Sequence, residues 1–76
     1  MNRGNKIISI VLPVYNEAGI LQELYKNLSN VISSRPEQFE IIFVNDGSTD
    51  NSLNILLEIK KEDKRICILD FTRNFG

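Results

Sequence analysis

Three short runs of apolar and β-branched residues alternate along the chain with two longer segments in which apolar residues recur at helical spacing. The runs cover residues 7–12, 40–44 and 66–69. Their apolar positions are nearly continuous rather than alternating, which is typical of strands that are buried on both faces of a parallel sheet. We therefore expect three parallel strands, the first of which ends at Pro13.

Two helices are expected between these strands. The apolar positions of the first are Leu21, Leu24, Tyr25, Leu28, Val31 and Ile32. The positions that mark the second are Leu53, Leu56, Leu57 and Lys60, with Ile55 and Ile59 widening its apolar side. Asn16 is a candidate N-cap for the first helix with Glu17 in its first turn, and Thr49 or Asp50 is a candidate for the second. Residues 33–36, which include a proline, end the first helix.

The order strand–helix–strand–helix–strand predicts an α/β fold, one half of a doubly wound domain with a parallel sheet. If the strands lie in sequential order, two right-handed crossovers place both helices on one face. The other face is then apolar and uncovered, which isolated monomers rarely tolerate. We expect this face to pack against more protein. The occupant that we favour is a further part of a longer chain, and the alternative is a second copy in a homodimer.

Composition and charge narrow the possible classes of function. The chain has 76 residues, a formal net charge of −1 and no histidine. It lacks the basic face of a nucleic-acid binder. Because histidine is absent, the chain also lacks the commonest general base and the commonest zinc ligand. The single cysteine, Cys67, lies in an apolar run and is expected to be a buried core thiol. The sequence shows neither a membrane span nor a signal peptide, so we expect a cytoplasmic protein.

Polar residues gather in two loops, each directly after a predicted strand. They cover residues 12–17 and 44–50. Ligands of open α/β sheets bind outside the carboxyl ends of the strands, so these loops are the candidate binding site. The ring of Tyr15 can stack on a base, and the carboxylate of Asp46 can accept a hydrogen bond from a ribose hydroxyl or a base N–H. The helix N-termini nearby are suited to phosphate.

Each of these features also has a purely structural interpretation. Residues 45–48 are by themselves a turn sequence, and residues 48–50 are typical helix caps. Tyr15 alone is consistent with packing against the first helix, and Glu17 with a solvated position in its first turn. Neither G-x-G-x-x-G nor G-x-x-x-x-G-K-[ST] occurs, so a dinucleotide site and a P-loop have no support.

In combination, the two loops resemble family 2 glycosyltransferases, which have the nucleotide-sugar-binding GT-A fold. The matching segments are Pro13-Val14-Tyr15-Asn16-Glu17, Val44-Asn45-Asp46-Gly47-Ser48-Thr49-Asp50 and Arg73-Asn74-Phe75-Gly76. The third segment resembles the branch that transfers sugars to polyprenyl phosphates, which includes bactoprenol glucosyltransferases and dolichol-phosphate mannose synthases. The resemblance covers nearly the whole chain. It implies that residues 1–76 are the N-terminal nucleotide-binding part of a Rossmann-like GT-A domain, truncated before its catalytic residues.

The resemblance also implies roles for single residues. The implied nucleotide-binding residues are Pro13, Tyr15 and Glu17, in the base and ribose pocket, and Val44 and Asp46, at the nucleoside. Among these Asp46 is the strongest candidate. Arg73 would lie near the mouth of the active site. Asn45 departs from the family pattern, which often has aspartate there, but the acid matching the nucleotide contact is retained.

The implied activity is transfer of a hexose from a nucleotide diphosphate sugar, UDP-linked rather than GDP-linked, to a polyprenyl phosphate at the cytoplasmic face of the membrane. The family's Asp-x-Asp motif, which holds Mg²⁺ or Mn²⁺ on the diphosphate, would follow Gly76, as would the catalytic base. The departing diphosphate develops negative charge, which that metal ion normally offsets. Asp70, at the end of the third predicted strand, has no second metal ligand beside it in the sequence. We therefore expect this chain to hold no metal and to lack transferase activity by itself.

Two alternatives to this function stay open. One is a family 2 transferase with a saccharide acceptor, which would act in the synthesis of cell-surface polysaccharide. The other is a catalytically empty nucleotide-binding module that dimerises through its uncovered sheet face. The first alternative differs from the favoured function in its acceptor. The second differs in that it has no part in catalysis.

Overall fold

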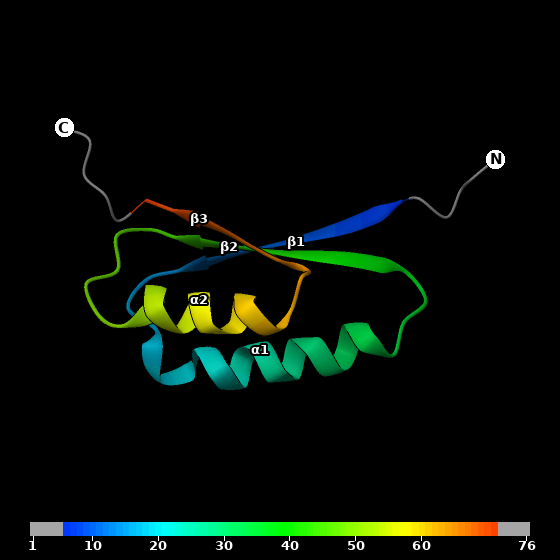
Figure 1. Cartoon of the computed structure of the whole chain (residues 1–76), viewed down its shortest axis with the longest axis horizontal. Coiled ribbons are helices and arrows are strands. Elements are labelled where there is room, and N and C mark those ends of the chain that lie inside the picture. Colours follow the sequence, from blue (N-terminus) through cyan, green and yellow to red (C-terminus); the bar gives the residue numbers. More distant parts are fainter. Residues whose placement is uncertain (1–5, 72–76) are drawn as a thin grey trace.

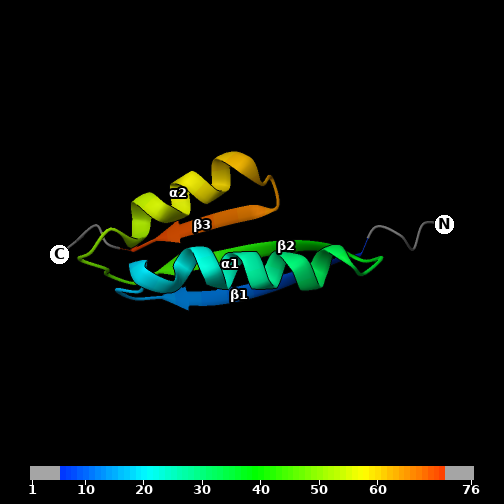
Figure 2. The same ribbon diagram turned by 90° about the horizontal axis from the view of Figure 1, so that it is seen from below.

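The computed structural model describes residues 6–71, in which two helices lie on one side of a three-stranded parallel sheet (Figure 1). The elements are β1 (Ile7–Val14), α1 (Ala18–Ser33), β2 (Gln38–Asn45), α2 (Ser52–Glu62) and β3 (Ile66–Asp70). The strand order is β1-β2-β3, and Ile10, Ile41 and Ile66 are register partners. Figure 2 shows α1 across β1 and β2, and α2 near β3. The predicted α/β order and the shared helix face are confirmed.

The first strand runs further than the sequence predicts, through Pro13 to Val14. β1 is an edge strand of the described sheet. The carbonyl of Val14 accepts a hydrogen bond from the N–H of Asp46 at 2.9 Å, so the backbone of Val14 faces β2. The backbone of Pro13 then faces the open edge, because successive residues of a strand alternate. No ladder hydrogen bond is lost there, and this explains why the proline does not end the strand.

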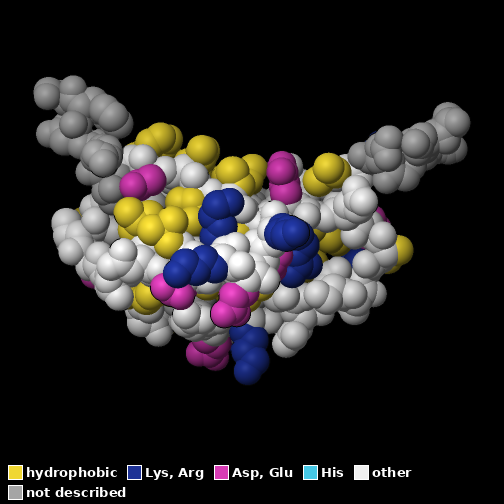
Figure 3. All heavy atoms as spheres, in the orientation of Figure 1, with side chains coloured by type: hydrophobic (Ala, Val, Ile, Leu, Met, Phe, Trp, Pro, Cys, Tyr) yellow, Lys and Arg dark blue, Asp and Glu magenta, His cyan; other side chains and the backbone are white. Residues whose placement is uncertain are grey.

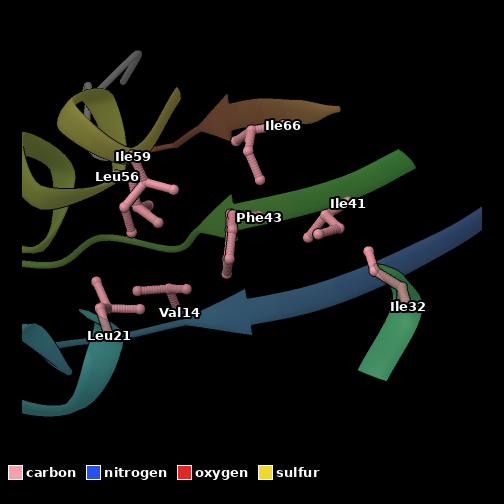
Figure 4. Packing of buried hydrophobic residues seen from close by; sticks show 8 residues of the cluster. All are labelled: Val14, Leu21, Ile32, Ile41, Phe43, Leu56, Ile59 and Ile66. Carbon is pink, nitrogen blue, oxygen red and sulfur yellow. The ribbon is translucent and has the colours of Figure 1, made fainter. Parts of the chain in front are cut away.

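The hydrophobic core lies between the sheet and the two helices (Figure 4). The strands contribute alternate residues to it, among them Ile41 and Phe43, both 0 % exposed. Leu21 of α1 and Leu56 of α2 are also 0 % exposed and pack against this side of the sheet. Burial of each such side chain stabilises the fold by about 1.5–3 kcal/mol. The core therefore fixes both helices, and with them the loops that connect the strands to the helices.

The outer face of the sheet is exposed in the described part of the chain, as expected when both helices lie on the other face. Val11 is 58 % and Leu69 45 % exposed, and Figure 3 shows hydrophobic side chains along the sheet side of the molecule. Cys67 is exposed too, which corrects the prediction of a buried core thiol. Side chains of a strand alternate between faces, so Cys67 points away from the helices that Ile66 and Ile68 contact.

The two helices end close to where the sequence predicts. α1 ends at Ser33, within the predicted stop segment. α2 carries Lys60 and Lys61 in its last turn, where positive charge interacts favourably with the helix dipole. Within residues 6–71, neither helix is long and apolar enough to cross a membrane. The prediction of one uncovered sheet face is confirmed, whereas its occupant stays a prediction.

Candidate functional site

The two polar loops meet at the carboxyl edge of the sheet, as predicted. The first loop, residues 15–17, follows β1, and the second, residues 46–51, follows β2. Their parent strands are paired in parallel, and the N–H of Asp46 extends this pairing by binding the carbonyl of Val14. Both loops therefore leave the sheet at one corner (Figure 1).

The side chain of Asn16 joins the two loops. Its Oδ1 accepts hydrogen bonds from the backbone N–H of Thr49 at 2.7 Å and of Asp50 at 3.2 Å, and from the Thr49 hydroxyl at 3.4 Å. Its own N–H donates to Oγ of Ser48 at 3.0 Å. The φ angle of Asn16 is 51°, in the left-handed region that asparagine tolerates better than most residues. Asn16 is thus not the predicted N-cap of α1 but a link between loops.

The N-cap position of α1 belongs to Glu17, which makes no capping bond with its own side chain. The second loop and the first residue of α2 supply the caps instead. The N–H of Glu17 donates to Oγ of Ser52 at 3.0 Å, and the N–H of Ala18 donates to Oδ2 of Asp50 at 3.1 Å. These N–H groups are already satisfied by protein side chains, so they are not available to a phosphate. The binding of a phosphate by other N–H groups at the helix N-termini stays a prediction.

The N-cap of α2 is Asn51 rather than the predicted Thr49 or Asp50. Asp50 still stabilises the start of this helix, because its Oδ1 accepts from the N–H and the hydroxyl of Ser52 at 2.9 and 2.6 Å. The bond from the Ser52 hydroxyl is the main reason that the pKa of Asp50 lies below its ordinary value. Gly47 has a φ of 82°, so the turn there favours glycine.

Four of the five residues predicted to bind a nucleotide lie at the carboxyl ends of adjacent strands. Pro13 and Val44 are register partners. The residue after each of them is buried toward the helices, so Pro13 and Val44 face the outer side of the sheet. Tyr15, 59 % exposed, and the exposed Asp46 follow at the ends of the same two strands. The structure therefore places an apolar surface beside an accessible aromatic ring and an accessible carboxylate.

Glu17 and Arg73 complete the set of predicted site residues. The backbone of Glu17 has a structural role, because its carbonyl accepts the N–H of Ile20 at 3.0 Å while its N–H binds Ser52. The role of its half-buried side chain toward a nucleotide stays a prediction. Arg73 lies outside the described residues, so its predicted place near the active-site mouth also stays a prediction.

Asn45 has a role that sequence reasoning missed. Its side chain is fully buried, and its Nδ2 donates to Oδ1 of Asp70 at the end of β3, at 3.3 Å. The Oδ1 of Asn45 is buried without a hydrogen-bond partner among the described residues. An aspartate at this position would set two carboxylates side by side, and their repulsion would be costly in a buried site. The sequence feature that could have indicated this role is the position of a polar residue between an apolar strand and a turn.

No group of three or more histidine, cysteine, aspartate or glutamate side chains is placed to hold a metal ion within residues 6–71. The Mg²⁺ or Mn²⁺ that the resemblance implies therefore stays a prediction about a longer protein. A surface hollow lies at the opposite, amino-terminal edge of the sheet, where its lining includes Ile7, Gln38 and Ile66. Ligands of open α/β sheets bind at the carboxyl edge, so we place the candidate site at the two loops.

Comparison with known proteins shows the family to which the chain belongs. The family model described as glycosyl transferase family 2 matches residues 9–76, which include both loops. An uncharacterized glycosyltransferase of Bacillus subtilis, YkcC, is 50 % identical over 68 residues, which are 90 % of this chain and 21 % of the relative. An uncharacterized glycosyltransferase of Synechocystis is 41 % identical over 69 residues, which are 91 % of this chain and 22 % of that protein.

A bactoprenol glucosyl transferase of Shigella phage SfV is 39 % identical over 69 residues, again 91 % of this chain and 22 % of the relative. The chain thus spans about a fifth of the length of the curated relatives it matches. The match to the family model covers almost all of the chain, and the fold agrees with half of a GT-A domain. The chain therefore belongs to glycosyl transferase family 2.

Proposed function

We propose that this chain forms the nucleotide-binding part of a hexosyltransferase whose donor is a UDP-linked sugar. The observation that carries the proposal is the placement of Tyr15 and Asp46, both exposed, on two loops that Asn16 ties together. A carboxylate at Asp46 accepts hydrogen bonds from a ribose hydroxyl or a base N–H, and the ring of Tyr15 offers a flat face to the base. Pro13 and Val44 extend this surface with apolar contacts.

The proposed acceptor is a polyprenyl phosphate. Its support is the likeness to a protein named as a bactoprenol glucosyl transferase, together with the segment 73–76 that resembles the same branch. On this proposal the longer protein acts at the cytoplasmic face of the membrane. A family 2 transferase with a saccharide acceptor is the alternative, because the nucleotide-binding loops would be the same for either acceptor.

A divalent cation is part of the proposed chemistry. In such transfers Mg²⁺ or Mn²⁺ offsets the negative charge that develops on the departing diphosphate. Residues 6–71 contain no ligand set for it, so its ligands would come from other residues of the proposed longer protein. The residues described here would bind and orient the nucleoside, and we propose that they transfer no sugar by themselves.

The test is an NMR titration of the isotope-labelled chain with UDP, and with GDP for comparison. We expect weak binding, with a dissociation constant on the order of 1 mM or ~4 kcal/mol, because the cation and diphosphate contacts are missing. The amide signals of Tyr15 and Asp46 should shift with UDP. In Asp46→Ala these shifts should disappear, whereas Glu62→Ala, which removes an exposed carboxylate at the far end of α2, should bind UDP like the original chain.

The outcomes separate the parts of the proposal. A folded chain that shows no shifts with either nucleotide would contradict the nucleotide site. Equal or stronger binding of GDP would contradict the UDP-linked donor while keeping the site. Sugar transfer by the purified chain would contradict the proposal that these residues hold only the nucleoside.

A further inference from the structure

Hydrogen bonds between the two loops converge on a single side-chain oxygen. Oδ1 of Asn16 accepts from the N–H groups of Thr49 and Asp50 and from the Thr49 hydroxyl. The N–H of the same residue donates to Ser48. Asn16 directly follows Tyr15, and its partners begin two residues after Asp46. Asn16 therefore connects the segments that carry the two groups proposed to contact the nucleotide.

These bonds are exposed, which limits what they add to the stability of the fold. Asn16, Thr49 and Asp50 are all exposed, so water competes for each donor and acceptor. An intramolecular hydrogen bond adds about 0.5–1.5 kcal/mol net, and exposed ones lie at the low end. The core residues under the helices hold the fold without them. The bonds do restrict how the two loops move relative to each other, and a binding site gains affinity when its parts are held in place before the ligand arrives.

The backbone at Asn16 fits this linking role. A φ of 51° is unfavourable for most residues but is tolerated by asparagine, aspartate and glycine. Only asparagine and aspartate among these three also carry an acceptor oxygen at the right distance from the backbone. All three groups that bind Oδ1 are donors, so either an amide or a carboxylate oxygen can receive them. Glycine would keep the turn and the backbone bond to Ser48, and it would remove the three bonds to the side-chain oxygen.

We propose that Asn16 is a positioning residue for nucleotide binding, which holds the loop that carries Asp46 against the loop that carries Tyr15. The inference rests on the proposed function, because the loops matter to a ligand only if that ligand binds there. Asn16 acts through the second loop rather than by touching the nucleotide. Its removal should lower affinity while leaving the fold in place.

The experiment compares the original chain with Asn16→Gly, Asn16→Asp and Asn54→Ala by titration with uridine. Uridine is the probe because it has no phosphate that would repel an added carboxylate. We expect Asn16→Gly to bind about tenfold more weakly, which corresponds to ~1.4 kcal/mol. Asn16→Asp should bind within about twofold of the original chain, because its carboxylate accepts the same bonds. Asn54→Ala removes a comparable exposed amide bond, the one to Asn51 at 2.7 Å, and should bind normally.

Two further measurements make the result specific. Urea unfolding gives the folded fraction of each variant, by which the affinities are corrected. Hydrogen exchange at the amides of Thr49 and Asp50 reports the link itself, and it should become faster in Asn16→Gly and return toward the original rate in Asn16→Asp. A role limited to stability would change the folded fraction but not the corrected affinity.

The possible failures are distinguishable. If the original chain binds neither uridine nor UDP, the proposed function fails and the inference fails with it. If the original chain binds uridine and Asn16→Gly binds it equally well despite faster exchange, the inference is overturned and the proposed function stands. If Asn16→Gly does not fold, uridine must slow exchange at Thr49 and Asp50 in the original chain. Unchanged exchange in that experiment would also overturn the inference.

Discussion

Two groups of side-chain hydrogen bonds join the first strand–helix unit to the second, and they differ in burial and charge. The loop link consists of the exposed bonds of Asn16 to residues 48–50 at the carboxyl edge of the sheet. The Asp63 cluster joins Tyr25 of α1 to Asp63 and Arg65, which lie between α2 and β3. The first group is made of neutral donors and acceptors, whereas the second contains a partly buried ion pair.

The Asp63 cluster has the geometry of a strong interaction. Arg65 donates from Nε and Nη2 to the two oxygens of Asp63, at 2.9 and 2.7 Å, and the Tyr25 hydroxyl donates to Oδ2 at 2.6 Å. Hydrogen bonds from the Arg65 side chain are the main reason that the pKa of Asp63 lies well below its ordinary value. Burial, and then the bond to Asp63, raise the pKa of Tyr25. Asp63 is only 8 % exposed, so water replaces these bonds poorly.

The difference indicates that the two groups of hydrogen bonds have different roles. Bidentate, charge-assisted bonds to a buried carboxylate add stability, and their loss leaves a buried group without partners. Exposed neutral bonds add little stability but still restrict where two loops lie. The Asp63 cluster should therefore matter mainly for stability, and the loop link mainly for the candidate nucleotide site.

Asp63→Ala should have the largest effect on stability. Removing the carboxylate leaves Arg65 and Tyr25 without their common partner, and we expect the free energy of unfolding to fall by about 2 kcal/mol. This figure is below that of a fully buried pair because the Arg65 side chain is 32 % exposed. Urea unfolding measures the change, with Glu62→Ala as the matched control. Loss of uridine affinity in the folded fraction, with stability unchanged, would contradict the proposed difference in roles.

Acid should lower the free energy of unfolding by less than Asp63→Ala does. Protonation of Asp63 should account for more of this loss than protonation of Asp50. The folded-state pKa values of Asp63 and Asp50 both lie below their ordinary value of 3.8. Each contribution is therefore present above the unfolded-state pKa and is lost as the pH falls below it. Urea unfolding from pH 6 to pH 2 should show a shallower decline in Asp63→Asn than in Asp50→Asn. The reverse order would mean that the bonds of the Asp50 carboxylate to Ala18 and Ser52 carry more stability than the cluster.

Ser48→Ala should have the smallest effect on stability. It removes the acceptor of the Asn16 N–H, but that N–H is exposed and water can replace the lost partner. We expect the free energy of unfolding to fall by less than about 0.5 kcal/mol. Uridine affinity should fall measurably, though less than in Asn16→Gly, because the bonds to Asn16 Oδ1 persist. A stability loss as large as that of Asp63→Ala would remove the contrast between the two groups.

Most of the fold could be predicted from the periodicity of apolar residues. The three strands and two helices lie where their patterns are, and right-handed crossovers dictate that both helices share one face. Two of the errors concern the place of a residue within the sheet. Pro13 was predicted to end a strand that continues, because β1 is at an edge. Cys67 was predicted to be buried in a strand whose outer face is open.

The candidate site was predictable as a place but not as a set of contacts. The sequence by itself determined which loops follow the parallel strands, and hence that Tyr15 and Asp46 lie at one edge. Only the tertiary structure decided that the side chain of Asn16 binds the N–H of Asp50, 34 positions away in the sequence. The same holds for the side chain of Asp50, which binds the N–H of Ala18, 32 positions away. Capping rules concern neighbours within one helix turn. An acceptor brought close by the packing of another unit can satisfy the same N–H group, and the local sequence contains no record of that choice.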